Sequence, residues 1–189
     1  YYDEVIRAPS LAFDPATGIF TIRRGRVPDG AAYRSGGIYA QDIFTPGRKI
    51  TVSGALRHSV AWYRSRRANS PRVGGTFLWP DDWLRLGAWT WRAGLMYAPV
   101  EPIAVFANFG RGFRAPNLIE RYFSGPSTDG TAIQIANPGL APETSTNYDV
   151  GLRANFSHVD FEYFYFRNNL KDGILTRPTG RTIGRLAEF

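Results

Sequence analysis

The sequence predicts an all-β protein with an antiparallel, up-and-down sheet. Apolar and polar residues alternate with a period of two over most of the chain, whereas no window of comparable length fits a helix. Turn-forming residues are frequent, with 20 Gly and 13 Pro among 189 residues. The connections between the expected strands alternate between short and long, which is typical of a sheet with all its tight turns at one end.

The alternation defines three strand pairs. A weaker strand over 37–44 leads through Thr-Pro-Gly-Arg into the clearest strand, 49–63. Strands over 89–97 and 103–109 are aromatic-rich and flank a short segment with two prolines. Strands over 148–156 and 159–166 enclose the two-residue turn at 157–158, although Phe164 and Phe166 interrupt the polar face of the last one. Further strands are expected near Ile19 and after Thr179, giving seven or eight in all.

The lengths of the connections favour a transmembrane β-barrel. Short connections at 45–48, 98–102 and 157–158 alternate with long ones at 64–82 and 110–143. Outer-membrane barrels have this pattern, with short periplasmic turns and long external loops. The 49–63 strand would reach about 50 Å at roughly 3.3 Å per residue, more than a tilted membrane crossing needs. We therefore expect a strand that projects beyond the bilayer and a long extracellular loop over 110–143.

The alternation also predicts which side chains face lipid and which face the barrel interior, because polar groups are costly in hydrocarbon. The residues expected to face lipid are Ile50, Val52, Leu56, Val150, Leu152, Phe161 and Tyr163. The residues expected to face the lumen are Thr51, Ser53, Arg57, Asp149, Arg153, Asp160 and Glu162.

Composition excludes several classes of protein. Cysteine is absent, so disulfide frameworks, thiolate metal sites and cysteine nucleophiles are excluded. The net charge of +7 reflects 21 arginines with only two lysines, and two arginine clusters, at 23–26 and 64–72, lie beside Gly, Pro, Ser and Asn, which favours solvated loops over a nucleic-acid surface. No catalytic constellation or cofactor motif is present, and Asp81 and Asp82, in a long loop, are expected to be solvated or lumen-facing charges. His58, on the expected lipid face, and His158, in a turn, are not expected to bind metal.

Four sequence blocks then resemble one family. They are GIYAQD at 37–42 followed by the strand at 50–57, AGLMYAP at 93–99, NFGRGFRAP at 108–116, and NPGLAPE at 137–143 with YDVGL at 148–152. In this order they resemble the barrel of TonB-dependent receptors. The resemblance implies an outer-membrane barrel of roughly 22 strands with an N-terminal plug, importing iron chelates, haem, cobalamin or glycans with energy from TonB. Residues 1–189 would then be a slice of that barrel without its plug.

The expected ligand-binding residues lie in and beside the 110–143 loop, because long loops on a rigid scaffold often carry binding groups. They offer cationic donors and aromatic surface: Arg111, Arg114, Asn117, Arg121, Tyr122 and Phe123. An equally open alternative is that this loop gates or shields the barrel and that missing plug loops bind the ligand. Haem receptors of the family carry a histidine between the two motifs at 113–116 and 137–140, and this chain has none there.

Two other functions remain open from sequence. The chain could be a complete small outer-membrane barrel with an adhesive or structural role. It could also be a soluble β-sheet module that binds anionic partners through its arginines.

Overall fold

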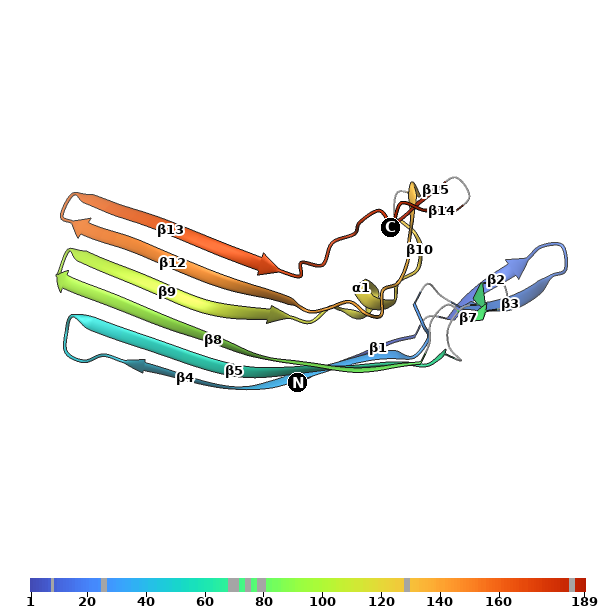
Figure 1. Cartoon of the computed structure of the whole chain (residues 1–189), viewed down its shortest axis with the longest axis horizontal. Coiled ribbons are helices and arrows are strands. Elements are labelled where there is room, and N and C mark those ends of the chain that lie inside the picture. The colour runs from blue at the N-terminus through green and yellow to red at the C-terminus, as the bar shows by residue number, and fades with distance from the viewer. Residues whose placement is uncertain are drawn as a thin grey trace.

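A seven-stranded antiparallel sheet forms most of the molecule (Figure 1). The structure, a computed structural model, describes residues 1–7, 9–24, 27–67, 72–73, 76–77, 81–127, 130–183 and 186–189. In spatial order the strands are β1 (Tyr2–Ile6), β4 (Ala31–Phe44), β5 (Ile50–Ser65), β8 (Asp82–Val100), β9 (Ile103–Arg114), β12 (Glu143–Phe156) and β13 (Val159–Lys171). The all-β prediction and the up-and-down order are therefore confirmed.

The short and long connections separate to opposite ends of this sheet. The turns at 45–49, 101–102 and 157–158 lie at the left end in Figure 1, and the long connections lie at the right end. The long connections contain β2 (Pro9–Asp14), β3 (Ile19–Arg24), β6 (Arg72–Val73), β7 (Thr76–Phe77), α1 (Leu118–Tyr122), β10 (Gly125–Pro126) and β11 (Ala132–Gln134). Among the described residues, no helix is long and apolar enough to cross a membrane.

Two of the expected strands form but do not join the large sheet. The strand at Ile19 is β3, which pairs with β2 as a separate hairpin. The strands after Thr179 are β14 (Thr182–Ile183) and β15 (Leu186–Glu188), and β15 pairs with β11 instead. The seventh strand of the large sheet is β1, which the alternation pattern did not predict.

The longest connection is shorter than expected, because β9 continues to Arg114 and β12 begins at Glu143. The loop is therefore 115–142. Gly110 and Gly112, which fall within the loop expected over 110–143, belong to β9 and remain in register with Asn147 and Ser145. A Cβ atom on Gly112 would lie 2.5 Å from Ser145 Oγ, so the absence of a side chain here leaves space for the Ser145 hydroxyl.

Strand register places the two predicted sets of side chains on opposite faces of the sheet. Leu56 aligns with Trp91, and the same row continues through Arg111 to Thr146. Every residue that was expected to face lipid lies on the same side of the sheet as this row, and we call this side the apolar face. Every residue that was expected to face the lumen lies on the other side, which we call the polar face.

A glycine also accommodates a bulky aromatic side chain on the polar face. Gly151 lies between Phe106 on β9 and Phe164 on β13, and the two rings are 5.0 Å apart between centroids. A Cβ atom on Gly151 would overlap the Phe106 ring. The two rings therefore cover the backbone of β12 at a point where a larger residue has no space.

We expect Gly151→Ala to lower the free energy of unfolding by about 1–3 kcal/mol, because the added methyl group overpacks this site. Urea unfolding of the receptor that carries this chain, in detergent micelles, would measure the change. Gly54→Ala is the matched control, since a Cβ atom there meets nothing within 4 Å. Phe106→Ala should restore the stability lost in Gly151→Ala. Equal stability of the two glycine variants would contradict this account.

Candidate functional site

The helix α1 folds back over the polar face at the loop end of the sheet. Asn117 begins it with a capping box: its side chain accepts a hydrogen bond from Glu120 N, and the Glu120 carboxylate accepts one from Asn117 N, both at 2.8 Å. Leu118 and Tyr122 then pack against Tyr63 of β5. The remaining members of this buried cluster are Val27, Ala31 and Ala61. The helix therefore covers the ends of β4, β5 and β8.

Arg121 is the most constrained side chain of this region, with no exposed surface. Its guanidinium donates to Asp82 Oδ2 at 2.9 Å, to Leu140 O at 3.1 Å and to Pro138 O. The same group lies 4.6 Å from the centroid of the Tyr63 ring. These contacts join α1, β5, β8 and the turn at 137–140, and we call them the Arg121 cluster.

Two tyrosines complete the Arg121 cluster. Tyr63 donates to Pro116 O and Tyr122 donates to Asp82 Oδ2, each at 2.5 Å. Burial, followed by the hydrogen bond to Asp82 and its negative charge, raises the pKa of Tyr122 above its ordinary value. The Tyr122 hydroxyl therefore stays protonated and remains a donor across the physiological pH range.

This geometry corrects the expected roles of several loop residues. Arg121 and Tyr122 were expected to offer donors and aromatic surface to a ligand, but both are buried by contacts within the chain. Asp82 was expected to lie in a long loop as a solvated or lumen-facing charge; it begins β8, on the polar face, and pairs with Arg121. The reason is that the capping box starts a helix whose side chains turn inward, which alternation alone cannot show.

The other predicted binding residues are also placed by the structure. Arg114 pairs with Glu143 at 2.5 Å and with Glu120 at 3.0 Å, and Glu143 also accepts from Ile174 N. Phe123 is half-buried against the same apolar cluster. Arg111 lies in β9 on the apolar face, beside Trp91 and Thr146, and is therefore not a loop residue.

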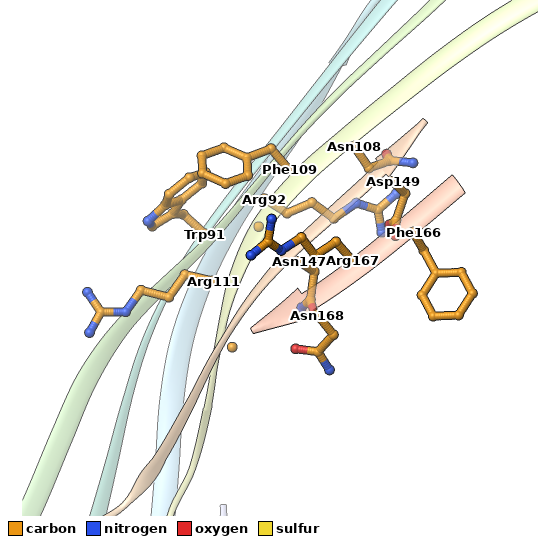
Figure 2. A pocket seen from close by; sticks show the side chains of 12 residues that line it. Trp91, Arg92, Asn108, Phe109, Arg111, Asn147, Asp149, Phe166, Arg167 and Asn168 are labelled. Carbon is orange, nitrogen blue, oxygen red and sulfur yellow. The ribbon is translucent and has the colours of Figure 1, made fainter. Parts of the chain in front are cut away.

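A hollow of about 580 Å³ lies on the polar face, closer to the short turns than the Arg121 cluster is, and Figure 2 shows the side chains that line it. Gly110 and Gly112 form its floor, because neither contributes a side chain. The lining residues that share the polar face with them are one cation, one carboxylate, one aromatic ring and three amides: Arg92, Asp149, Phe166, Asn108, Asn147 and Asn168. The other lining side chains lie on the apolar face: Trp91, Phe109, Arg111 and Arg167. Figure 2 shows Trp91, Phe109 and Arg111 directed to that opposite side of the sheet. We call this site the polar hollow.

The polar hollow can bind a ligand but has no chemistry for a reaction. Its amides supply donors and acceptors, and Arg92 and Asp149 add one charge of each sign. Within the described part of the chain, no group of three His, Asp or Glu residues could hold a metal ion. His58 packs on Trp89 with ring centroids 4.7 Å apart, on the apolar face.

Sequence reasoning included Asp149 among lumen-facing residues but missed the other members of the polar hollow. The sequence pattern that could have revealed the hollow is a set of glycines and amides that lie on the same face of neighbouring strands. That signal needs the register of β8, β9, β12 and β13, which places Arg92, Gly110, Asn147 and Asn168 in one row.

Comparison with known proteins identifies the family to which this chain belongs. A family model described as TonB dependent receptor-like, beta-barrel, matches residues 1–187. The chain belongs to this family. Its members are outer-membrane transport receptors of bacteria rather than enzymes, so the seven-stranded sheet is part of an outer-membrane β-barrel. Membership of this family favours a segment of a TonB-dependent receptor over a small adhesive barrel or a soluble binding module.

Individual relatives cover limited parts of the chain. The vitamin B12 transporter BtuB of Vibrio vulnificus is 36% identical over 91 residues, which is 48% of this chain and 13% of that protein. The hemin receptor of Yersinia pestis is 29% identical over 104 residues, covering 47% of this chain and 15% of that protein. This chain thus spans about one seventh of the curated relatives it matches.

Solved structures share the fold at low sequence identity. The hemophore receptor HasR of Serratia marcescens, solved with its hemophore HasA and heme, has a TM-score of 0.63 and 18% identity. That match covers 80% of this chain and 28% of HasR. The copper transporter OprC has a TM-score of 0.61 and 14% identity over 85% of this chain and 25% of its own.

We expect Arg121→Met to lower the free energy of unfolding by about 3 kcal/mol, because it removes the cation that pairs with the Asp82 carboxylate and leaves two carbonyls without their donor. Limited proteolysis of the 115–142 loop and urea unfolding would both detect the change. The control is Arg153→Met, which removes a 2.5 Å pair with Glu162 whose side chains are 50% and 45% exposed. An exposed pair contributes less than about 1 kcal/mol. A smaller loss in Arg121→Met than in Arg153→Met would contradict the structural role of the Arg121 cluster.

Proposed function

We propose that this chain forms part of the barrel wall of an outer-membrane receptor that binds a scarce nutrient and imports it with energy supplied by TonB. The observation that carries the proposal is the sheet itself. All long connections lie at one end, and one of them folds over the polar face through the Arg121 cluster. Such an arrangement suits a receptor that captures its ligand at the external mouth of a barrel.

The proposal assigns the two faces of the sheet. The apolar face contacts lipid, since charges are costly in hydrocarbon, and the polar face lines the lumen. Arg57, Arg153 and Glu162 then face the lumen together with Asp149 and Asp160. The 115–142 loop lies outside the cell, and the polar hollow lies below it within the barrel.

An iron-siderophore is the ligand class that this segment suits best. The polar hollow offers neutral amides with one cation and one carboxylate, which bind a polar chelate by hydrogen bonds. Histidine ligation of haem receives no support from the described residues, because His58 is on the apolar face and His158 is in a short turn. The relatives named for vitamin B12 and hemin transport use the same barrel for other cargo.

Deleting residues 124–134 from the receptor tests the role of the loop. The deletion removes β10 and β11 but leaves α1 and the carbonyls of Pro138 and Leu140, so the Arg121 cluster stays complete. We expect about tenfold weaker binding of the transported nutrient, with normal heat-modifiable assembly in the outer membrane. If affinity and uptake survive this deletion, the 115–142 loop is not the specificity element.

Substitutions in the polar hollow test the lumen separately. Arg92→Gln combined with Asn147→Ala should reduce uptake several-fold, because it removes one charge and one amide from the hollow. Arg153→Gln is the matched control, since it removes one positive charge from the same face outside the hollow. Equal uptake by the wild-type receptor, the double variant and Arg153→Gln would show that the transported nutrient does not contact the polar hollow.

A further inference from the structure

Three arginines are grouped on the apolar face near the loop end of the sheet. Arg34, Trp62 and Arg85 lie side by side in one row across β4, β5 and β8. In the next row toward the loops, Arg64 pairs with Trp83. All five side chains are exposed, and the indole of Trp83 is 85% exposed. We call this group the arginine patch.

The height of the arginine patch matches the edge of a bilayer. Trp62 lies twelve residues beyond Ile50 along β5. At about 3.3 Å per residue and a tilt of roughly 45°, this distance corresponds to about 28 Å along the membrane normal. The hydrocarbon core is about 30 Å thick, and barrels carry aromatic girdles at both of its edges. Trp62 and Trp83 have the positions of such a girdle, with the arginines beside them.

The charge on this face is uneven. Two carboxylates lie on the apolar face of the seven-stranded sheet, Asp3 and Asp42. Asp42 lies near the short turn, far from the arginine patch, and Asp3 forms an exposed pair with Arg34 at 3.2 Å. In the described part of the chain, no carboxylate pairs with Arg64 or Arg85. Two cations are thus available to an external anion.

A second observation is that this surface is hollowed. Tyr1, Arg34, Trp62, Arg64 and Trp83 line a depression of about 590 Å³. Arg85 also lies over the Trp62 ring, 5.9 Å from its centroid, which holds one guanidinium beside the indole. The depression therefore combines aromatic walls with guanidinium groups, and guanidinium binds phosphate by paired hydrogen bonds.

We propose that the arginine patch binds the phosphorylated headgroup of a glycolipid in the outer leaflet of the membrane. The guanidinium groups of Arg64 and Arg85 contact the phosphate, and Trp62 and Trp83 lie against the sugar and the upper acyl chains. The inference rests on the proposed orientation of the apolar face toward lipid, and it goes beyond nutrient uptake because the site is on the outside of the barrel.

The test measures binding of purified lipid A to the receptor in detergent, with Arg64→Gln/Arg85→Gln compared with the wild type. We expect about tenfold weaker binding of diphosphorylated lipid A by this variant. Arg57→Gln is the matched control, because it removes a cation from the polar face, and its binding should equal that of the wild type. Trp83→Ala is a second variant that leaves folding intact, since its side chain is exposed, and it should weaken binding several-fold.

Three outcomes would overturn the proposal. Equal binding of lipid A lacking its phosphates would show that the contact is apolar. Inorganic phosphate that binds as tightly as lipid A would show a site for a free anion. An equal loss in Arg57→Gln would show that the apolar face is not the binding surface. Nutrient uptake should persist in Arg64→Gln/Arg85→Gln, so failure of this inference is distinguishable from failure of the proposed function.

Discussion

The backbone of a strand that crosses hydrocarbon must satisfy every N–H and C=O group within the protein, and the rest of this structure depends on that constraint. The seven strands meet it through a continuous antiparallel ladder from β1 to β13. A ladder of this kind gives neighbouring side chains opposite directions, so one face can be apolar while the other is polar. The separation of Leu56 from Arg57, and of Leu152 from Arg153, follows from it.

The loop end of the sheet is organised by a different interaction. Here Arg121 is fully buried and is compensated by the carboxylate of Asp82, two backbone carbonyls and the face of Tyr63. Removal of a guanidinium from water is costly, and several partners with good geometry are needed to offset the cost. The segments at 113–116 and 137–140 join the cluster through their backbone, because Pro116, Pro138 and Leu140 supply carbonyl acceptors. These contacts fix the loop on the sheet.

Glycine has a consistent role on the polar face. At Gly112 and Gly151 the missing side chain leaves space for Ser145 and for the Phe106 ring, and beside Gly110 it leaves the floor of the polar hollow. The apolar face differs, since its loop end carries arginines and indoles without a matching set of carboxylates. One sheet thus presents two binding surfaces with different chemistry, one toward the proposed lumen and one toward the proposed outer leaflet.

The sequence by itself determined the all-β class, six of the seven strands of the large sheet, the two sets of side chains on its faces and the family. These features are local or periodic: alternation is a property of each strand, and the short turns at 45–49 and 157–158 fix the pairing of their neighbours. The sequence did not reveal β1, whose pairing with β4 spans a connection of more than twenty residues. It also overestimated the loop, because strand ends depend on partners across the ladder.

Tertiary structure alone decided the roles of the charged and aromatic residues near the loops. Arg111, Arg114 and Arg121 look alike in sequence, but one lies on the apolar face, one pairs with Glu120 and Glu143, and one is buried against Asp82. The partners are distant in sequence: Glu143 is 29 positions from Arg114, and Asp82 is 39 positions from Arg121 and 40 from Tyr122. The polar hollow has the same origin, since its amides come from β9, β12 and β13 and share a site only through the register of those strands.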